Sequence, residues 1–437
     1  MSKLTEYELT QIFPVSIPGE WGSEPVNEGN ALVLRAADFT KDCKLRALVG
    51  VPRNISRLKL DNRILHDGDI LIEKSGGSPD QPVGRVIFFD RGNEARNYIP
   101  SNFLQLLRVA EGLDQKFSYY LMAFLYSEGR VYRYQQQTTG IINLKLESYL
   151  KEKVFIPSNL VQKYIQNILS TIDHAIATTE ALIEKYQKIK AGLMHDLFTR
   201  GIGADGKLRP PRNQAPELYQ ESEIGWIPQD WEFKAFQYGL NASPKNGYSP
   251  KEVETWQGVY VLGLGCLTKN GFIPIQLKKA PRNSLKSGAR LEEGDFLISR
   301  SNTQELVGLC GIYRDIGHDA IYPDLIMRLK LHQNLSAEFL EQYLLSPAVR
   351  QRISAIAVGT SGSMVKINSK TIKSLKIIYP DFGEQIKVVE KLQPVITQLD
   401  CLCTQLEKLK KQKSGLMHDL LTGKVSVNIE PDEVAHD

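Results

Sequence analysis

Apolar residues recur with the spacing of a long helix in two stretches of the chain. Both stretches alternate between steps of about four and three residues, which is typical of the narrow seam of a coiled coil. The first seam consists of Val161, Ile165, Ile168, Ile172, Ala175, Thr179, Leu182, Tyr186, Ile189 and Leu193. The second consists of Leu392, Val395, Leu399, Leu402, Leu406, Leu409, Lys413 and Leu416. This pattern predicts helices over residues 158–200 and 381–425, the second beginning or kinking at Pro394.

Each predicted helix needs a partner, because a seam this narrow covers only a second helix with the same seam. The chain itself supplies one, so we expect the two helices to pair as an antiparallel coiled coil with one globule near each end. The alternative is that each stripe packs only on its own globule, which is the commoner use of an apolar stripe.

Short β-like runs separated by turn signals fill the rest of both halves. "GDILIEK", "SGGSPDQPVG" and "RVIFFD" (68–90) predict strand, loop and strand. A mostly buried helix is expected at Phe117–Ser127, with its counterpart at Phe339–Leu345, since both runs are strongly apolar. The predicted fold class is therefore α+β: two mixed α/β globules, residues 1–157 and 232–380, joined by the two helices.

One hexapeptide occurs twice and relates the two halves. "GLMHDL" stands at Gly192–Leu197 and again at Gly415–Leu420, 223 residues later (415 − 192 = 223). The same offset joins Pro100 to Pro323, Leu121 to Leu344 and Pro157 to Pro380. A period this long exceeds that of a solenoid repeat. It predicts an internal pseudo-two-fold duplication, in which each copy is a globule followed by a helix.

Composition narrows the functional classes without choosing one. The net charge of +4 permits nucleic-acid binding but does not require it. We expect a cytoplasmic protein, because the chain shows no export signal, no run of about 18 apolar residues, and cysteines that are odd in number and unevenly spread. Gly, Pro and polar residues over 201–231 predict a linker, and residues 426–437 predict a disordered acidic tail.

Motifs for catalysis and for cofactors are missing from the sequence. It contains no phosphate loop, no HExxH and no His/Cys cluster with zinc spacing, and "GLGCLTKNG" lacks the third glycine of a dinucleotide loop. Asp69, Glu73 and Lys74 share one predicted strand, as nuclease residues do. The second half has Ser299 and Arg300 in place of the last two, so this set is not maintained. We therefore expect no catalytic residue and no metal site in this chain.

The histidine and aspartate of "GLMHDL" do not predict a catalytic dyad, because adjacent side chains on a helix do not face each other. Two interpretations of the motif remain open. Each copy finishes its helix, with the imidazole near the negative helix end, or its apolar residues meet another protein.

Polar loops in corresponding places of both halves are the candidates for contact with nucleic acid. Arg, Asn and Gln side chains suit bidentate hydrogen bonds to guanine and adenine, and glycine-bearing loops can turn backbone amides toward phosphate. A plain solvated loop is the alternative, which two corresponding loops per half make weaker. The candidate residues are Lys74, Ser75, Arg85, Gln135 and Gln136 in the first half, and Arg300, Ser301, Asn302, Gln304, Ser361, Ser363 and Lys366 in the second.

Taken together, these motifs resemble those of the specificity subunits of type I restriction-modification systems. The marks are the helix endings "AGLMHDLFTRGI" and "SGLMHDLLTGKV", the linker "APELYQESEIGWIPQDWE", the strand "GDFLISRS" and the helix entry "IYPDFGEQ". The resemblance covers nearly the whole chain. The first half departs from it in "IPSNLVQK", which lacks the Glu-Gln of "FGEQ".

The resemblance implies a non-catalytic, DNA-binding subunit. Each globule would be a target recognition domain that reads one half of a split double-stranded DNA sequence. The two helices would be conserved spacers that also dock two methyltransferase subunits, which restriction subunits join. Those partners would bind S-adenosylmethionine, ATP and Mg²⁺, this chain would bind no cofactor, and no membrane contact is expected. The expected partner contacts are Met194, His195 and Leu197, with Met417, His418 and Leu420.

Two other functional classes stay open on the sequence. One is an enzyme with an unrecognised nuclease or methyltransferase site, which binding of S-adenosylmethionine by the purified chain would support. The other is a coiled-coil scaffold that binds only protein. A salt-dependent DNA shift by the chain with its methyltransferase partner would exclude it.

Overall fold

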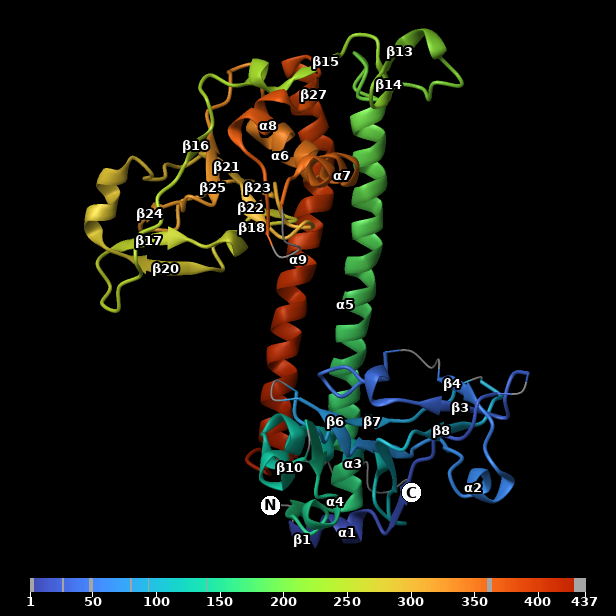
Figure 1. The fold of residues 1–437 in the computed structure, drawn as a ribbon. Coiled ribbons are helices and arrows are strands. Elements are labelled where there is room, and N and C mark those ends of the chain that lie inside the picture. Colours follow the sequence, from blue (N-terminus) through green and yellow to red (C-terminus); the bar gives the residue numbers. More distant parts are fainter. Residues whose placement is uncertain are drawn as a thin grey trace. The chain divides into compact units, whose positions relative to one another are not determined.

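The computed structural model describes residues 4–25, 27–46, 50–78, 81–92, 94–138, 140–359 and 364–427. The chain forms two compact units, called here unit 1 (Met1–Glu180 with Thr404–Asp437) and unit 2 (Ala181–Cys403). Each unit combines one globule with one segment of each long helix, α5 (Asn159–Thr199) and α9 (Phe382–Leu421) (Figure 1). The boundary between the units thus divides both helices.

Both long helices predicted from the apolar period are present. The first turn of α9 is capped by Asp381, whose carboxylate accepts a hydrogen bond from the backbone N–H of Gly383 at 2.9 Å. The helix therefore begins at Phe382 and continues past Pro394. The alternative in which it begins at the proline is wrong.

Within unit 1 the two helices run in opposite directions. Asp173 of α5 pairs with Lys413 of α9 at 2.9 Å, and further along α5 Glu180 pairs with Lys410 at 2.8 Å. The residue number rises along α5 while it falls along α9, so the pair is antiparallel. The predicted antiparallel pairing is confirmed in this unit.

A heptad seam alternates between two positions of the helix, and along α5 one of these two differs from the prediction. Ile165 and Ile176 are buried, each with 2% of its surface exposed. Leu182 and Ile189, which the prediction placed in the seam, are 38% and 41% exposed. After Ile165 the more buried residues follow steps of four and then three, whereas the predicted seam has three and then four. Every second seam residue therefore lies one position later than predicted, for example Ile176 instead of Ala175.

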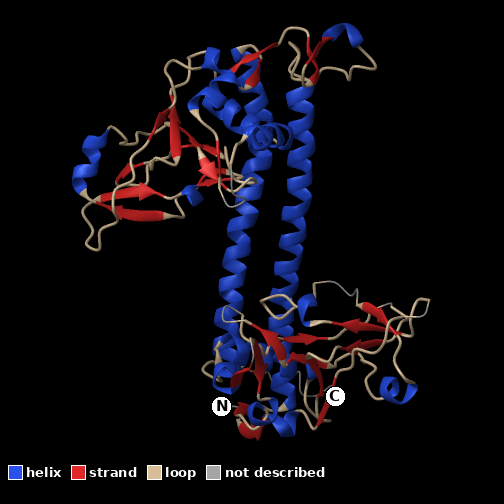
Figure 2. Ribbon diagram, viewed as in Figure 1, coloured by secondary structure: helices blue, strands red, loops and turns tan. Residues whose placement is uncertain are grey.

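The globule of unit 1 consists of small sheets, and its four-stranded sheet packs one face against α3 (Gln115–Ser127) and the other against the sheet β4-β3-β8. Its four-stranded sheet has the order β2-β9-β5-β7, in which β5 and β7 are the predicted strand pair. Met122 of α3 is fully buried and shares one core with Ile72 of β5 and Ile165 of α5, as expected for a helix that is strongly apolar. Figure 2 shows that strands and loops make up most of each globule beside the long helices. The strands are β1 (Thr5–Glu8), β2 (Val15–Pro18), β3 (Ala31–Leu34), β4 (Val51–Arg53), β5 (Ile70–Glu73), β6 (Ser75–Gly77), β7 (Val86–Phe88), β8 (Tyr98–Pro100), β9 (Leu104–Arg108), β10 (Gln135–Thr138), β11 (Ile141–Leu144) and β12 (Lys153–Ile156), and the short helices are α1 (Leu9–Ile12), α2 (Arg57–Asp61) and α4 (Leu146–Tyr149).

The globule of unit 2 repeats this plan. Its four-stranded sheet has the order β16-β25-β21-β23, and α6 (Ala337–Leu345), the predicted counterpart of α3, shares a core with it. The further helices are α7 (Pro347–Ile356) and α8 (Ser369–Ser374). The strands are β13 (Tyr219–Ser222), β14 (Gly225–Pro228), β15 (Glu232–Ala235), β16 (Lys245–Asn246), β17 (Val259–Leu262), β18 (Leu267–Thr268), β19 (Gly271–Phe272), β20 (Leu277–Ala280), β21 (Phe296–Ser299), β22 (Ser301–Asn302), β23 (Cys310–Ile312), β24 (Asp319–Ile321), β25 (Ile326–Leu329), β26 (Val365–Lys366) and β27 (Lys376–Tyr379).

A buried glutamine holds the start of each long helix in the same way. The side-chain carbonyl of Gln162 accepts from the backbone of Asp114 at 2.9 Å, and its amide donates to Pro157. Gln385 accepts from the backbone of Ser336 at 2.9 Å and donates to Pro380. The first half therefore keeps the glutamine of "FGEQ", and its departure from the Glu-Gln pair is confined to the glutamate, which is replaced by Val161.

Residues 201–231, predicted as a linker, are built onto unit 2. They contain the hairpin of β13 and β14, and Trp231 is 2% exposed. The carboxylate of Glu384, in the first turn of α9, accepts from the backbone of Ile202 at 2.6 Å and from the indole of Trp231 at 2.9 Å. It also pairs with Arg209 at 2.5 Å, so this segment is fixed to the helix by a buried ion pair.

Candidate functional site

The two candidate loops of the first half are joined into one small sheet. The strand order is β10-β11-β6, which we call ribbon 1. Ser75 lies opposite Asn143, and their side chains are hydrogen bonded at 2.5 Å. Gln136 lies opposite the same asparagine on the other side. Residues that are distant in the sequence thus share one surface.

The candidate loops of the second half are joined in the corresponding way. Strands β22 and β26 form an antiparallel pair, called here ribbon 2, with Ser301 opposite Lys366 and Asn302 opposite Val365. The carbonyl of Arg300 accepts from the backbone of Ile367 at 2.9 Å and extends the pairing. In each unit the first strand of the ribbon directly follows an inner strand of the four-stranded sheet, β5 or β21.

Several candidate side chains have partners within the chain. The Lys74 ammonium donates to Gln105 at 3.2 Å, and burial lowers the pKa of Lys74. The Gln135 amide donates to the carbonyl of Val83 at 3.1 Å.

The other candidates differ in how open they are to a ligand. The Arg300 guanidinium reaches the carbonyl of Asp324 at 3.4 Å, and Gln304 donates to Ser354. The side chains of Gln136, Gln304 and Lys366 are exposed. These three residues are therefore the most accessible candidates.

Arg85 was expected to contact DNA, and the structure contradicts this. Arg85 is 4% exposed, and its guanidinium donates to both carboxylate oxygens of Glu73 at 2.8 and 2.9 Å. With further bonds to the carbonyls of Phe39 and Ala36, four of its five N–H donors are used within the chain. An arginine used in this way stabilises the core and cannot reach a base.

Ser301 is also a wrong prediction, because it is 1% exposed. Its backbone pairs within ribbon 2 while its side chain points into the protein. Ser361 and Ser363 lie outside the described residues, so their assignment stays a prediction.

The ribbons bring forward residues that the sequence did not single out. Asn143 lies on the central strand of ribbon 1. Tyr132, which is 62% exposed, and exposed Arg133 come just before β10, another strand of this ribbon. Beside ribbon 2, Met364 is 42% exposed. The aromatic and cationic start of "YRYQQQTTG" is the signal that could have identified the first pair.

The apolar residues of "GLMHDL" are core residues, contrary to the expectation that they contact a partner. Met194 and Leu197 are 3% and 1% exposed in the core of unit 2, and Met417 and Leu420 are 9% and 8% exposed in the core of unit 1. Each copy therefore closes the globule of the other repeat. Outside the seam, the end of α5 packs against α6 and the end of α9 packs against α3. The ring centres of Phe198 and Tyr343, for example, are 5.3 Å apart.

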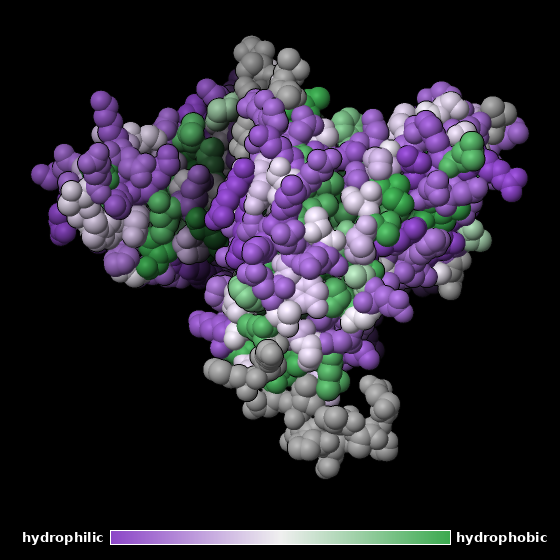
Figure 3. All heavy atoms as spheres, turned by 90° about the horizontal axis from the view of Figure 1, so that it is seen from below, coloured by the Kyte–Doolittle hydropathy of each residue, from purple (hydrophilic) through white to green (hydrophobic). Residues whose placement is uncertain are grey.

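The histidines of both copies remain exposed, and each lines a pocket. The pocket beside His195 in unit 2 has a volume of about 310 Å³, and the pocket beside His418 in unit 1 has a volume of about 1030 Å³. The face drawn in Figure 3 is mostly hydrophilic, with hydrophobic residues in small separate areas. Concave sites of this kind are therefore the better candidates for specific contact.

The acidic residues considered as a possible nuclease site form ion pairs with arginines. Asp69 pairs with Arg108 at 3.1 Å, and Glu73 pairs with Arg85. Within the described part of the chain, no group of three His, Cys, Asp or Glu residues is placed to hold a metal ion. Nor does any described helix combine the length and the apolar character needed to cross a bilayer.

Comparison with known proteins places this architecture in one family. The type I restriction modification DNA specificity domain matches residues 2–188 and 245–411. The specificity subunit of the type I restriction enzyme MjaVIII from Methanocaldococcus jannaschii is 25% identical over 391 residues, which cover 85% of this chain and 82% of that subunit. The EcoKI specificity subunit of Escherichia coli K12 is 25% identical over 388 residues, covering 86% of this chain and 77% of that subunit.

Among solved structures, the type I restriction-modification S subunit from M. genitalium has the same fold, with a TM-score of 0.55 and 15% identity. That match covers 98% of this chain and 97% of the other. Two matches to the specificity domain, each of which includes most of one long helix, account for the duplication in the sequence. The chain belongs to the family of type I restriction-modification specificity subunits.

Proposed function

We propose that this chain recognises a bipartite DNA sequence, with unit 1 reading one half and unit 2 the other. One observation carries the proposal: each unit joins its two candidate loops into a ribbon on equivalent strands. The equivalent pairs are β6 with β11 in ribbon 1 and β22 with β26 in ribbon 2, and ribbon 1 adds β10 as a third strand. A β-ribbon of two strands is narrow enough to enter the major groove of B-DNA. Membership of a DNA specificity family supports the same ligand.

Exposed polar side chains on the ribbons are the proposed readers. The amides of Gln136 and Gln137 suit the paired donor and acceptor of adenine, and Lys366 suits guanine or a backbone phosphate. Asn302, beside Lys366 on ribbon 2, adds a second amide. Arg133, which precedes ribbon 1, supplies a positive charge for the backbone.

We propose further that α5 and α9 set the distance between the two readers and dock two methyltransferase subunits. Leu182 and Ile189 are 38% and 41% exposed on α5, and exposed His195 lies further along the helix. Apolar side chains exposed along one helix are typical of a protein-binding surface. Methylation and ATP-driven cleavage would then belong to the methyltransferase and restriction subunits, and this chain would be non-catalytic.

Mapping of methylated bases tests the two-reader proposal. In complex with the methyltransferase, the pair Gln136→Ala and Gln137→Ala should relax one half of the methylated sequence and leave the other half intact. The pair Asn302→Ala and Lys366→Ala should act on the other half alone. A lost bidentate contact weakens discrimination by about 1–3 kcal/mol at one base pair. Either pair changing both halves would contradict the proposal.

A further inference from the structure

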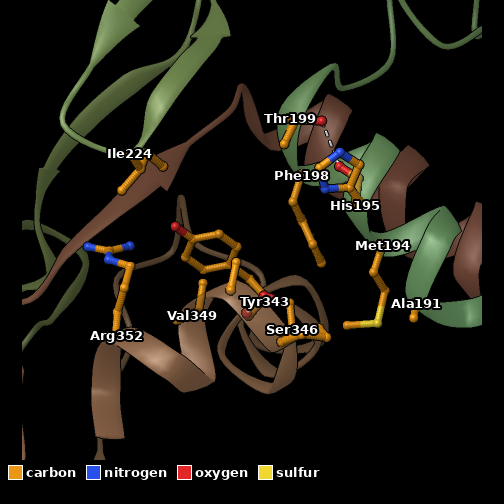
Figure 4. Close-up of a pocket in the computed structure, with 12 residues that line it drawn as sticks. Ala191, Met194, His195, Phe198, Thr199, Ile224, Tyr343, Ser346, Val349 and Arg352 are labelled. Carbon is orange, nitrogen blue, oxygen red and sulfur yellow. Dashed lines mark hydrogen bonds between the residues drawn. The ribbon is translucent and has the colours of Figure 1, made fainter. Parts of the chain in front are cut away.

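The pocket beside His195 in unit 2 is formed by four separate elements. Helix α5 contributes Met194 and Phe198, α6 and α7 contribute Tyr343 and Arg352, and the turn between β13 and β14 contributes Ile224 (Figure 4). Its volume of about 310 Å³ is at the lower end for a small-molecule site and suits one or two side chains.

Two polar atoms in this pocket have no hydrogen bond of good geometry among the described residues: the hydroxyl oxygen of Tyr343 and the Nη1 atom of Arg352, which neighbour each other. Tyr343 is 2% exposed, and its hydroxyl points toward the side of the pocket where Arg352 lies (Figure 4). The other terminal nitrogen of Arg352 donates to the carbonyl of Lys376 at 2.7 Å, which fixes the guanidinium. Buried donors without acceptors are destabilising, so a ligand that brings an acceptor gains by binding here.

The duplication shows which acceptor completes this arrangement. Tyr120 in unit 1 corresponds to Tyr343 (343 − 120 = 223), and its hydroxyl donates to Asp173 at 2.9 Å. Lys413 and Lys44 pair with the same carboxylate at 2.9 and 3.2 Å. Burial tends to raise the pKa of Asp173, yet the two lysines and the tyrosine outweigh it and lower that pKa. In unit 1 a tyrosine and cations therefore share a carboxylate of the chain itself.

Unit 2 has no carboxylate at the corresponding place in its sequence. The residue that matches Asp173 is Ile396 (396 − 173 = 223). The unit 2 pocket thus combines the tyrosine hydroxyl and a cation, Arg352, with an apolar wall of Met194 and Phe198. An acid from outside the chain, next to an apolar group, would complement both parts.

We propose that this pocket binds an acidic side chain of a methyltransferase subunit together with a neighbouring apolar side chain. The carboxylate accepts from Tyr343 and Arg352, and the apolar side chain packs on Phe198 and Ile224. A methyltransferase is the partner because exposed His195 lines the pocket and belongs to α5, the helix whose exposed Leu182 and Ile189 are proposed above as a docking surface. The inference rests on the proposed docking of methyltransferase subunits on the helices.

Conservative variants test the pocket in the full chain. Tyr343→Phe and Arg352→Gln should each weaken binding of the methyltransferase subunit of the same system about tenfold at one of two sites, as measured by calorimetry, because each removes a hydrogen bond to a charged group. The matched control is Tyr120→Phe, which removes the equivalent hydroxyl from an internal bond. It should leave methyltransferase affinity unchanged and lower the unfolding temperature, whereas Tyr343→Phe should not lower it.

Each of the other possible results contradicts a different part of the proposal. Wild-type affinity at both sites in Tyr343→Phe and Arg352→Gln overturns the pocket while leaving methyltransferase docking in place. Failure of the wild-type chain to bind the methyltransferase overturns the docking proposal and this inference with it. If both variants weaken DNA binding by the chain alone and leave methyltransferase affinity intact, the acceptor is a nucleic-acid phosphate and the inference is wrong.

Discussion

Glu73 and Arg85 form a buried ion pair in the core of the first globule. The two residues are 1% and 4% exposed and are joined by two hydrogen bonds. In the sequence, an arginine that follows a glycine-rich loop looks equally suited to DNA. Its true partner lies 12 residues away on the paired strand, a contact that the sequence pattern does not specify.

Arg85→Met should lower the free energy of unfolding by about 3–5 kcal/mol, because the Glu73 carboxylate stays buried without its partner. Urea unfolding measures the change, and replacing both residues by methionine should recover much of the loss. The exposed control Lys366→Ala should stay within about 0.5 kcal/mol of the wild type. A fully stable Arg85→Met variant with an altered DNA target would mean that Arg85 is a reader after all.

Met417 and Leu420 give a second prediction at this scale. Each change to alanine should lower the free energy of unfolding by about 2–5 kcal/mol, because both side chains are buried in the core of unit 1. Lys411→Ala, on the exposed face of the same helix, is the control. Thermal unfolding follows all three variants. Unchanged stability with loss of one bound methyltransferase would restore the interpretation of these residues as partner contacts.

Among the elements, those with a long regular period could be predicted and those made by distant pairing could not. Helices α5 and α9 follow from many apolar residues at one spacing. The ribbons depend on pairs such as Ser75 with Asn143, and residues 201–231 depend on Glu384. Such contacts leave no local pattern, so the loops were identified while their pairing was missed.

The seam of α5 gives a prediction about an element. Ile176→Ala should lower the free energy of unfolding by about 2–5 kcal/mol, since Ile176 is 2% exposed. Leu182→Ala should change it by no more than about 0.5 kcal/mol, since Leu182 is 38% exposed. Denaturant unfolding of the two variants compares them directly. Equal losses would show that the seam runs through Leu182, as the apolar spacing alone suggested.

At the scale of the whole molecule, the two repeats exchange their helix ends. The "GLMHDL" of the first repeat packs in unit 2, and that of the second repeat packs in unit 1. The offset of 223 residues predicted the duplication (415 − 192 = 223), while this exchange appears only in the packing. Each unit therefore depends on both repeats for its core.

The length of the helices should set the length of the DNA between the two recognised halves. Duplicating residues 178–181 adds about 6 Å to α5, at 1.5 Å per residue. The unrecognised gap should grow by about one or two base pairs, at 3.4 Å per base pair. Sequencing of methylated DNA reports the gap. Altered half-sites around an unchanged gap would contradict a spacing role for the helices.

Exchange of one globule tests most directly whether each unit reads its own half of the target. Residues 1–157 are replaced by the equivalent globule of a related specificity subunit, and the bases methylated by the complex are mapped across a genome. We predict that one half of the target changes to that of the donor while the other half and the gap stay as they were. A target in which both halves change together would contradict the account.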